Sequence, residues 1–113
     1  MSEKPTKYGN VKTMIDGIKF DSTKEATFYG RLKMMKLSGQ ITDFICQPKF
    51  TYYVSFLAND RKFGYDRKYI ADFKVIFPDG RIEIWDVKGF RTSIYKQKKK
   101  IVEKLYGIKI IEK

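Results

Sequence analysis

The residues most capable of chemistry lie in the segment PDGRIEIWDVKG at positions 78–89. Asp79 and Asp86 are acids that could hold a divalent metal ion, and Lys88 is a cation two residues after Asp86. However, Pro78-Asp79-Gly80 is also what a three-residue hairpin loop requires, with glycine in the left-handed position. We therefore interpret Asp79 as a turn residue and look for the first acid elsewhere.

The length of this loop decides which acids meet. In a three-residue loop Phe77 faces Arg81, and counting back along both strands places Asp72 opposite Asp86. Lys88 points from the same face as Asp86, because strand side chains alternate. A two-residue loop would shift the register and put the two acids on opposite faces. The alternative without chemistry is a sheet end in solvent, where Lys88 only neutralises the aspartates.

The composition limits the chemistry further. The 113 residues include no histidine and one cysteine, Cys46, which excludes serine and cysteine triads, histidine bases and cysteine-rich zinc sites. Carboxylate ligands favour Mg²⁺ or Mn²⁺ over zinc. The 24 basic and 13 acidic residues give a net charge of +11. This charge indicates a polyanion as partner, with nucleic acid favoured over a basic surface that serves only solubility.

The N-terminal elements follow from turn and capping signals. Residues 11–15 and 18–20 flank Asp16-Gly17 and predict a β-hairpin. A helix is expected from Ser22 to about Leu37, because Ser22 and Glu25 form a capping box and Ser38-Gly39 follows as a stop signal.

The remaining elements carry the candidate acids. Residues 41–56 predict a strand broken near Pro48, and residues 58–68 a charged connection. Residues 69–77 and 81–87 predict two strands, residues 93–107 a helix and residues 108–111 a last strand. The fold class is therefore α/β or α+β, with a mixed central sheet flanked by helices and an N-terminal hairpin.

The expected organisation is a flexible basic arm over residues 1–8 and a single domain over residues 9–113. No stretch reaches the roughly 20 apolar residues of a membrane span, and the N-terminus lacks the apolar core of a secretory signal. The single cysteine fits a reducing compartment, and we expect a cytoplasmic protein with no membrane partner.

Glu25 is a further candidate acid. It lies three and four residues before Phe28 and Tyr29 and seven before Leu32, so it belongs to the inward stripe of the first helix. Two roles remain open at this point. Glu25 caps the helix together with Ser22, or its carboxylate faces a metal ion held by Asp72 and Asp86.

Four short motifs together carry a resemblance. They are SxxE at 22–25, QPKF at 47–50, YIADF at 69–73 and DVKG at 86–89. In this order they resemble the small phage-encoded members of the PD-(D/E)XK nuclease superfamily, and they are similar to archaeal-type Holliday junction resolvases and to end-cutting transposase subunits. The similarity spans roughly residues 7–111. Ala71 stands where the first motif nominally has proline, a position that the superfamily keeps loosely.

The resemblance implies a restriction-endonuclease-like core. It also implies a metal-dependent endonuclease that hydrolyses DNA, with branched recombination intermediates as substrates. For a phage-encoded protein, the expected location is the cytoplasm of the bacterial host. The resemblance further implies Mg²⁺ or Mn²⁺ at Asp72, Asp86 and the Val87 carbonyl, with Glu25 as the helix-borne acid and Lys88 as the catalytic lysine. Gln47 falls where related enzymes carry a polar residue near the metal.

Contacts with DNA are expected from the segment RTSIYKQKKK at the start of the second helix. Arg91, Lys96, Lys99 and Lys100 lie off its apolar stripe and would meet backbone phosphates. Tyr95 could stack on a base or simply pack against the core. The alternative is a solvated helical face.

Two functions from different classes remain open. An enzyme that cuts two strands symmetrically needs two active sites, so a homodimer is expected. A non-catalytic nucleic-acid-binding module would use the same basic and aromatic residues, with the acids incidental.

Overall fold

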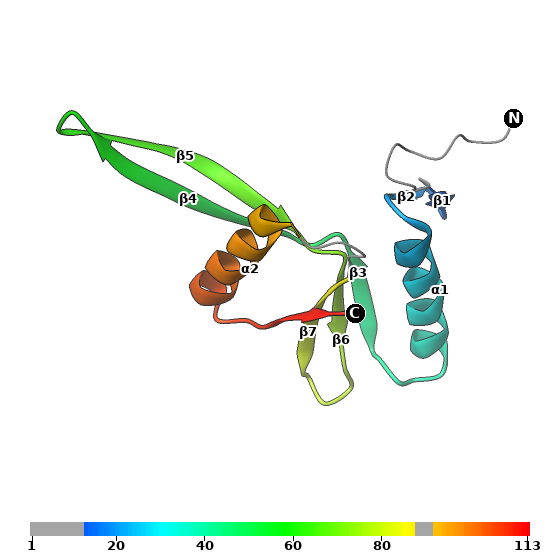
Figure 1. Cartoon of the computed structure of the whole chain (residues 1–113). Coiled ribbons are helices and arrows are strands. Elements are labelled where there is room, and N and C mark those ends of the chain that lie inside the picture. Colours follow the sequence, from blue (N-terminus) through cyan, green and yellow to red (C-terminus); the bar gives the residue numbers. More distant parts are fainter. Residues whose placement is uncertain (1–12, 88–91) are drawn as a thin grey trace, which may run out of the picture. The chain divides into compact units, whose positions relative to one another are not determined.

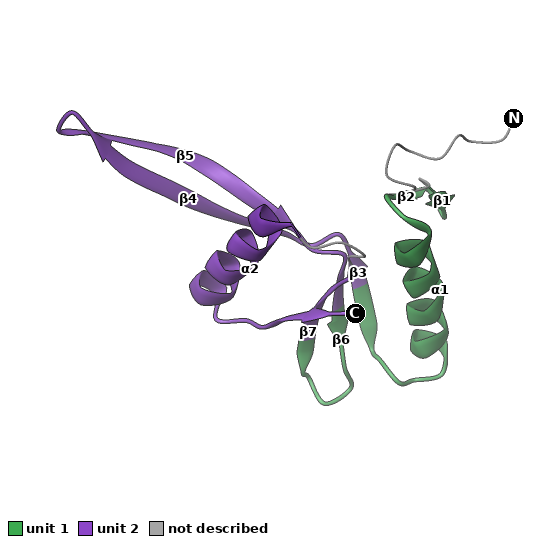
Figure 2. Ribbon diagram, viewed as in Figure 1, with its two compact units in different colours: residues 1–44, 75–82 green, residues 45–74, 83–113 purple. Residues whose placement is uncertain are grey.

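The structure, a computed structural model, describes residues 13–87 and 92–113 of the chain. The chain divides into two compact units, residues 1–44 with 75–82 and residues 45–74 with 83–113 (Figures 1 and 2). The described residues form two helices and eight strands, a mixed α+β composition with an N-terminal hairpin. The predicted fold class is therefore confirmed. Neither described helix is long and apolar enough to cross a membrane.

The first unit begins with a hairpin of β1 (Thr13–Ile15) and β2 (Ile18–Phe20). The strands pair with Ile15 opposite Ile18, which leaves Asp16 and Gly17 as a two-residue loop. Both loop residues have positive φ, 54° and 78°, as a type I′ turn requires. The predicted hairpin is confirmed for residues 13–20, and residues 11 and 12 lie outside the described residues.

Helix α1 (Thr23–Leu37) follows with the predicted limits. Its N-cap is Ser22, whose Oγ accepts a hydrogen bond from the Glu25 backbone N–H at 3.2 Å. Gly39 after its end has a φ of 82°, the left-handed conformation that stops a helix. The buried face of α1 carries Glu25, Ala26, Tyr29 and Leu32.

A four-stranded sheet has the strand order β3 (Asp43–Cys46), β6 (Phe73–Ile76), β7 (Ile82–Asp86) and β8 (Ile110–Glu112). β7 and β8 run parallel, whereas a hairpin turn joins β6 and β7, so the sheet is mixed as expected. β3, β6 and β7 each contribute residues to both units.

The hairpin between β6 and β7 has the predicted three-residue loop. Phe77 N–H donates to the Arg81 carbonyl and Gly80 N–H donates to the Phe77 carbonyl, both at 2.9 Å. Gly80 has a φ of 88°, and Asp79 accepts a hydrogen bond from Arg81 N–H at 2.9 Å. Asp79 is therefore a turn residue, which leaves Asp72 as the acid to examine.

Two sequence predictions are wrong. Residues 58–68 are not a connection, because β4 (Lys49–Ala58) and β5 (Arg61–Ile70) pair over their full length. Asn59 and Asp60 form the loop between them, with φ values of 51° and 61°. The polar residues of β5 are compatible with a strand because most of them face solvent.

The strand predicted over residues 69–77 is divided. β5 ends at Ile70 and pairs with β4, while β6 begins at Phe73 and belongs to the four-stranded sheet. Ala71 and Asp72 lie at the break. Asp72 is therefore not a member of a regular cross-strand pair with Asp86.

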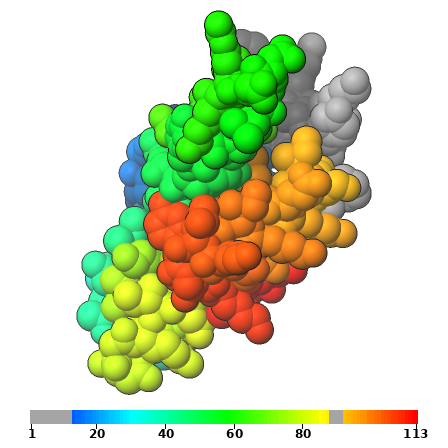
Figure 3. Space-filling view, turned by 90° about the vertical axis from the view of Figure 1, so that its left-hand side faces the viewer, coloured from blue at the N-terminus to red at the C-terminus, as the bar shows by residue number. Residues whose placement is uncertain are grey.

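The second unit has its own apolar core. Helix α2 (Ser93–Tyr106) lies beside the β4–β5 hairpin at the surface of this unit (Figure 3). The helix ends at Gly107, whose φ of 64° is left-handed, as the glycine predicts. The core of buried side chains, to which α2 contributes two, consists of Tyr52, Tyr69, Ala71, Ile84, Tyr95, Val102 and Ile110.

The Asp16 carboxylate connects the first turn to α1 and generates a pH prediction. Asp16 Oδ2 accepts hydrogen bonds from Lys33 Nζ and Tyr29 OH, both at 2.7 Å. The bond to Lys33, then that to Tyr29, lowers the pKa of Asp16. A depressed folded-state pKa means that this contribution to stability is present above about pH 3.9 and is lost as the pH falls through the folded pKa.

We expect Asp16→Asn, which keeps a turn-forming residue, to lower the free energy of unfolding at pH 7 and to have little effect near pH 2. Urea denaturation at both pH values measures this difference. In a Lys33→Met background the pH-dependent part of the effect should shrink. An equal loss of stability at both pH values would contradict the role of the charge.

Candidate functional site

Asp72 is held in place at the break between β5 and β6. Its carbonyl accepts a hydrogen bond from Gln47 N–H at 2.8 Å, and its own N–H donates to the Trp85 carbonyl at 3.1 Å. Gln47 itself has a φ of 56°, which lets the chain turn at the Gln47-Pro48 step between β3 and β4. These bonds fix the backbone of Asp72, and a hydrogen bond of its carboxylate fixes the direction of the side chain.

That direction leads to the end of β7. Asp72 Oδ2 accepts a hydrogen bond from the Val87 backbone N–H at 2.5 Å. Val87 directly follows Asp86 in the chain. The Asp72 carboxylate therefore contacts the backbone one residue after Asp86. Asp72 is 5% exposed and Asp86 is 0% exposed. The structure thus brings two buried acids to the same end of β7, although not by the regular pairing that the sequence predicted.

The Asp86 carboxylate has a partner from the β4–β5 hairpin. Tyr69, near the end of β5, donates its hydroxyl hydrogen to Asp86 Oδ2. Burial, this hydrogen bond and the charge of Asp86 raise the pKa of Tyr69 far above its usual range. Tyr69 therefore keeps its proton and acts as a permanent donor to Asp86, and it does not act as a base.

Tyr95 and Glu112 extend the network on the far side. Tyr95 OH donates to Glu112 Oε2 at 3.3 Å, and Glu112 lies opposite Asp86 in the parallel β7–β8 pair. Burial, and after it the charges of Asp86 and Glu112, raise the pKa of Tyr95. Lys99 Nζ lies 3.5 Å from Glu112 Oε1. Both tyrosines thus remain neutral donors beside acidic groups.

Sequence reasoning missed Tyr69 and Glu112. Tyr69 stands three residues before Asp72 in the motif YIADF, which offered a signal, but its contact with Asp86 depends on the division of this motif between two sheets. Glu112 is placed by the parallel pairing of β7 and β8. No local sequence pattern predicts that pairing, because helix α2 separates β7 from β8 in the chain.

Among the other residues predicted at the metal site, the structure describes Val87 and Glu25. Val87 directly follows β7 and is buried, and its backbone N–H donates to Asp72 Oδ2. Lys88 lies outside the described residues. Glu25 is buried on α1, in the first unit, and its backbone N–H donates to the N-cap Ser22 Oγ, which is one half of the predicted capping box. A role for its carboxylate at the metal stays a prediction.

The donors at the end of β7 suit a hard cation. Asp72 and Asp86 offer carboxylate oxygens and Val87 a carbonyl oxygen, which is the ligand chemistry of Mg²⁺ and Mn²⁺. Among residues 13–87 and 92–113, no group of three or more acidic or cysteine side chains is arranged to hold a metal ion. Two carboxylates do not fill the coordination sphere of such an ion, so backbone oxygen, water or substrate would complete it.

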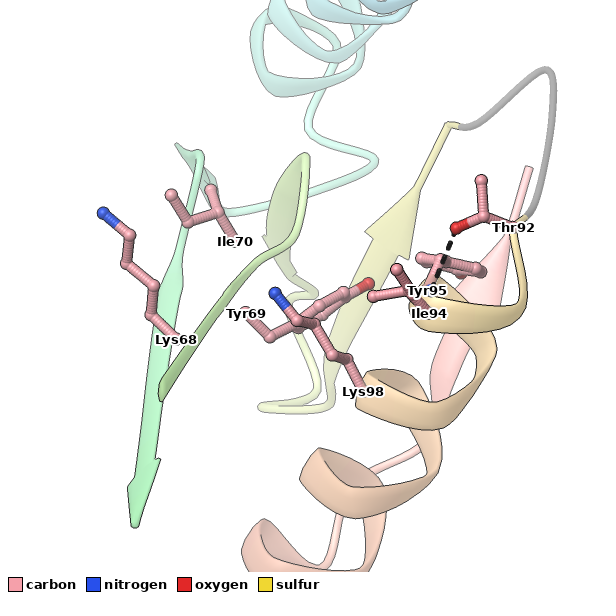
Figure 4. Close-up of a pocket in the computed structure, with 7 residues that line it drawn as sticks. All are labelled: Lys68, Tyr69, Ile70, Thr92, Ile94, Tyr95 and Lys98. Atoms are coloured by element: carbon pink, nitrogen blue, oxygen red, sulfur yellow. Dashed lines mark hydrogen bonds between the residues drawn. The ribbon is translucent and has the colours of Figure 1, made fainter. Parts of the chain in front are cut away.

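A pocket of about 350 Å³ adjoins this network (Figure 4). One side is formed by the end of β5 and the other by the first turns of α2, where Thr92 Oγ1 accepts a hydrogen bond from Tyr95 N–H at 3.1 Å. Tyr69 connects the pocket to Asp86, because its side chain lines the pocket and its hydroxyl bonds to the Asp86 carboxylate. The lining residues are Lys68, Tyr69, Ile70, Thr92, Ile94, Tyr95 and Lys98.

The residues predicted to contact DNA are distributed around α2. Lys96 and Lys100 are exposed on the helix, while Lys99 is half-buried and paired with Glu112. Tyr95 is buried in the core beside Tyr69, at a ring distance of 6.2 Å, so packing describes its place in the structure. Arg91 lies outside the described residues. Contact of these residues with nucleic acid stays a prediction.

Removal of the Tyr69 hydroxyl tests the network. Tyr69→Phe takes a hydrogen-bond donor from a fully buried carboxylate, so we expect a loss of roughly 1–3 kcal/mol in the free energy of unfolding. Urea denaturation measures the loss. The matched control is Tyr106→Phe, because the Tyr106 hydroxyl donates to the Thr51 carbonyl at 2.5 Å at an exposed position where water can replace it. Equal effects of the two substitutions would contradict the importance of the Tyr69–Asp86 bond.

Comparison with known proteins identifies the chain's family. No curated protein and no solved structure matches the chain. A family model described as a protein of unknown function (DUF1064) matches residues 5–110. Since this match covers nearly the whole length, the chain belongs to the DUF1064 family.

Proposed function

We propose that this protein is a metal-dependent endonuclease that hydrolyses phosphodiester bonds in DNA. The observation that carries the proposal is the hydrogen bond from Val87 N–H to Asp72 Oδ2, which draws the Asp72 carboxylate to the residue after the buried Asp86. Two buried acids at one strand end are costly unless they bind something or are firmly paired. The resemblance of the motifs to the PD-(D/E)XK nuclease superfamily supports the same function.

Asp72, Asp86 and the Val87 carbonyl are the proposed ligands of Mg²⁺ or Mn²⁺. When bound, such an ion supplies positive charge for the phosphate and lowers the pKa of a coordinated water. Both effects favour the hydrolysis of a phosphodiester. The remaining roles belong to the chain's own residues.

Those residues hold the acids in position. Tyr69 fixes one oxygen of Asp86 by its hydroxyl, and Val87 N–H fixes one oxygen of Asp72. We assign Lys88 to the orientation of the attacking water and to stabilisation of negative charge in the transition state.

The proposed substrate is branched DNA. The net charge of +11 supports a polyanionic partner. Lys96 and Lys100 on α2, together with Lys68 and Lys98 at the pocket, provide cations in the unit that contains Asp72 and Asp86. The preference for junctions comes from the resemblance to Holliday junction resolvases. A homodimer is proposed with it, because symmetrical cutting of two strands needs two sites.

One observation favours a second function, a nucleic-acid-binding module without catalysis. Asp86 is completely buried and accepts a hydrogen bond from Tyr69, as a purely structural carboxylate would. In that case the acids only organise the junction between the β4–β5 hairpin and the sheet. Cleavage assays separate the two functions.

Substitution of the acids tests catalysis. We expect Asp72→Asn, Asp86→Asn and Lys88→Ala each to reduce Mg²⁺-dependent cleavage of a labelled four-way junction by roughly 100-fold or more, since each removes charge from the reacting centre. Binding of the junction, measured by gel shift in EDTA, should be largely retained. The parallel substrates are a fork and a linear duplex.

Asp79→Asn is the matched control for these variants. Asp79 is an exposed turn residue, and asparagine can still accept the hydrogen bond from Arg81 N–H, so cleavage should be unchanged. Wild-type cleavage by all three site variants, or an absence of cleavage by the wild-type protein on every substrate, would favour the binding module.

Direct metal binding provides a separate test. The free Mn²⁺ signal in electron paramagnetic resonance should fall when wild-type protein is added. The Asp72→Asn/Asp86→Asn double variant should bind Mn²⁺ more weakly by at least roughly 10-fold, because both carboxylate ligands are lost. Asp79→Asn should bind as the wild type does. Equal binding by the wild type and the double variant would place the metal elsewhere.

A further inference from the structure

The β4–β5 hairpin is the feature that the proposed active site leaves unexplained. Its ten residue pairs run from Lys49 opposite Ile70 to Ala58 opposite Arg61. Tyr52 and Tyr69 at its root belong to the core of the second unit, but the hairpin then extends away from α2 (Figures 1 and 3). A two-stranded ribbon alone is marginally stable in water, so its exposed distal half calls for an explanation.

The distal half carries three aromatic rings on one face. Phe56 lies opposite Phe63, and their ring centroids are 5.6 Å apart in a stacked arrangement. Tyr65 meets Phe56 edge-on at 6.3 Å. These rings remain 48%, 45% and 44% exposed for Phe56, Phe63 and Tyr65. They are organised by contact with one another, and they nevertheless present nearly half of their surface to solvent.

Arginine side chains flank the rings on the same face. Arg61 and Arg67 share the strand parity of Phe63 and Tyr65, so all four project from one side of the ribbon. The Arg67 guanidinium lies 5.1 Å from the Tyr65 ring centroid. We call Phe56, Phe63, Tyr65, Arg61 and Arg67 the aromatic ribbon face.

The opposite face of the ribbon is built differently. A Cβ atom at Gly64 would collide with the Tyr53 ring, so the glycine allows this ring to lie flat across the neighbouring strand. Beyond it, Leu57 is 75% exposed and has no aromatic neighbour in its cross-strand partner Lys62. This face therefore offers a matched position for control substitutions.

The charge of the ribbon distinguishes two possible partners of this face, a second copy of the ribbon and a nucleic-acid strand. Residues 49–70 contain five basic and two acidic residues, a net charge of +3. A second copy of this ribbon would bring like charges together, which opposes a ribbon-to-ribbon dimer. A nucleic-acid strand offers negative phosphates for the arginines and flat bases for the rings.

We propose that the aromatic ribbon face binds unpaired bases of single-stranded DNA by stacking, with Arg61 and Arg67 on the adjacent phosphates. Phe63 and Tyr65 are alternate residues of β5 and stand about 7 Å apart, so each of these two rings can receive a base. This inference rests on the DNA partner of the proposed function but not on hydrolysis. It identifies the feature of branched DNA that is recognised, namely the unpaired nucleotides where strands separate.

The test uses a Phe56→Leu/Phe63→Leu double variant, which keeps apolar side chains in the strands but removes two stacking surfaces. Fluorescence anisotropy with a labelled 20-nucleotide oligo(dT) and with a blunt duplex of equal length, both in EDTA, measures affinity without cleavage. We expect the double variant to bind oligo(dT) roughly 10-fold more weakly and the duplex less than about 2-fold more weakly. Leu57→Ala should leave both affinities unchanged.

Photocrosslinking of the wild-type protein makes the test independent of variant folding. Oligo(dT) that contains 5-iodouracil should crosslink to Phe56, Phe63 or Tyr65, as identified by mass spectrometry. Equal oligo(dT) binding by wild type and double variant, or crosslinks confined to α2, would overturn the proposal. A wild-type dimer in analytical ultracentrifugation that the double variant loses would assign the face to a second copy of the chain.

Different experimental outcomes would reject the single-strand binding proposal and the nuclease proposal. Single-strand binding by an inactive wild-type protein would retain the aromatic ribbon face and reject catalysis. Metal-dependent cleavage with no preference for unpaired DNA would retain catalysis and reject the aromatic ribbon face.

Discussion

The second unit depends on how the backbone is held at Asp72. Two backbone hydrogen bonds, from Gln47 N–H and to the Trp85 carbonyl, hold this residue at the point where the chain leaves β5 and enters β6. The third bond joins its carboxylate to Val87 N–H. Because one residue connects the strand break to the end of β7, the position of the first acid is inseparable from the strand pairing around it.

The burial of two acids at one strand end has a physical cost. A carboxylate removed from water requires compensation from donors or cations, and proteins retain such arrangements mainly where the charge has a use. Tyr69 and Val87 N–H provide part of this compensation. Since burial and the acid beside it keep Tyr69 protonated, its donor role is constant over the ordinary pH range.

Tyr69 also relates the two proposed activities of the second unit. It belongs to β5, the strand that continues into the exposed ribbon, and it bonds to Asp86 at the proposed metal site. Phe50 and Tyr106 support the same root, with ring centroids 5.1 Å apart. The root of the ribbon and the end of β7 are thus parts of one packed network. A strand bound on the ribbon and a phosphate at the acids would be positioned by the same core.

The sequence by itself determined the local features of this protein. Four local features were predicted correctly, because each depends on the conformations that a few adjacent residues prefer. They are the Asp16-Gly17 turn, the Ser22 cap, the Pro78-Asp79-Gly80 loop and the end of α2 at Gly107. The loop length also identified Asp72 instead of Asp79 as the acid to examine. The composition, without histidine, excluded histidine-based chemistry, and the charge of +11 was the basis for predicting a polyanionic partner.

Only the tertiary structure decided where these residues meet. Three features join segments that are distant in the sequence: the pairing of β4 with β5, the break at Asp72 and the bond from Tyr69 to Asp86. Neither segment alone predicts which partner it will contact. The strand 69–77 was predicted as continuous because its residues all favour strands, and propensity cannot show that two sheets divide it. Hydrogen bonds and burial between distant segments made that division, since they depend on partners that local sequence does not specify.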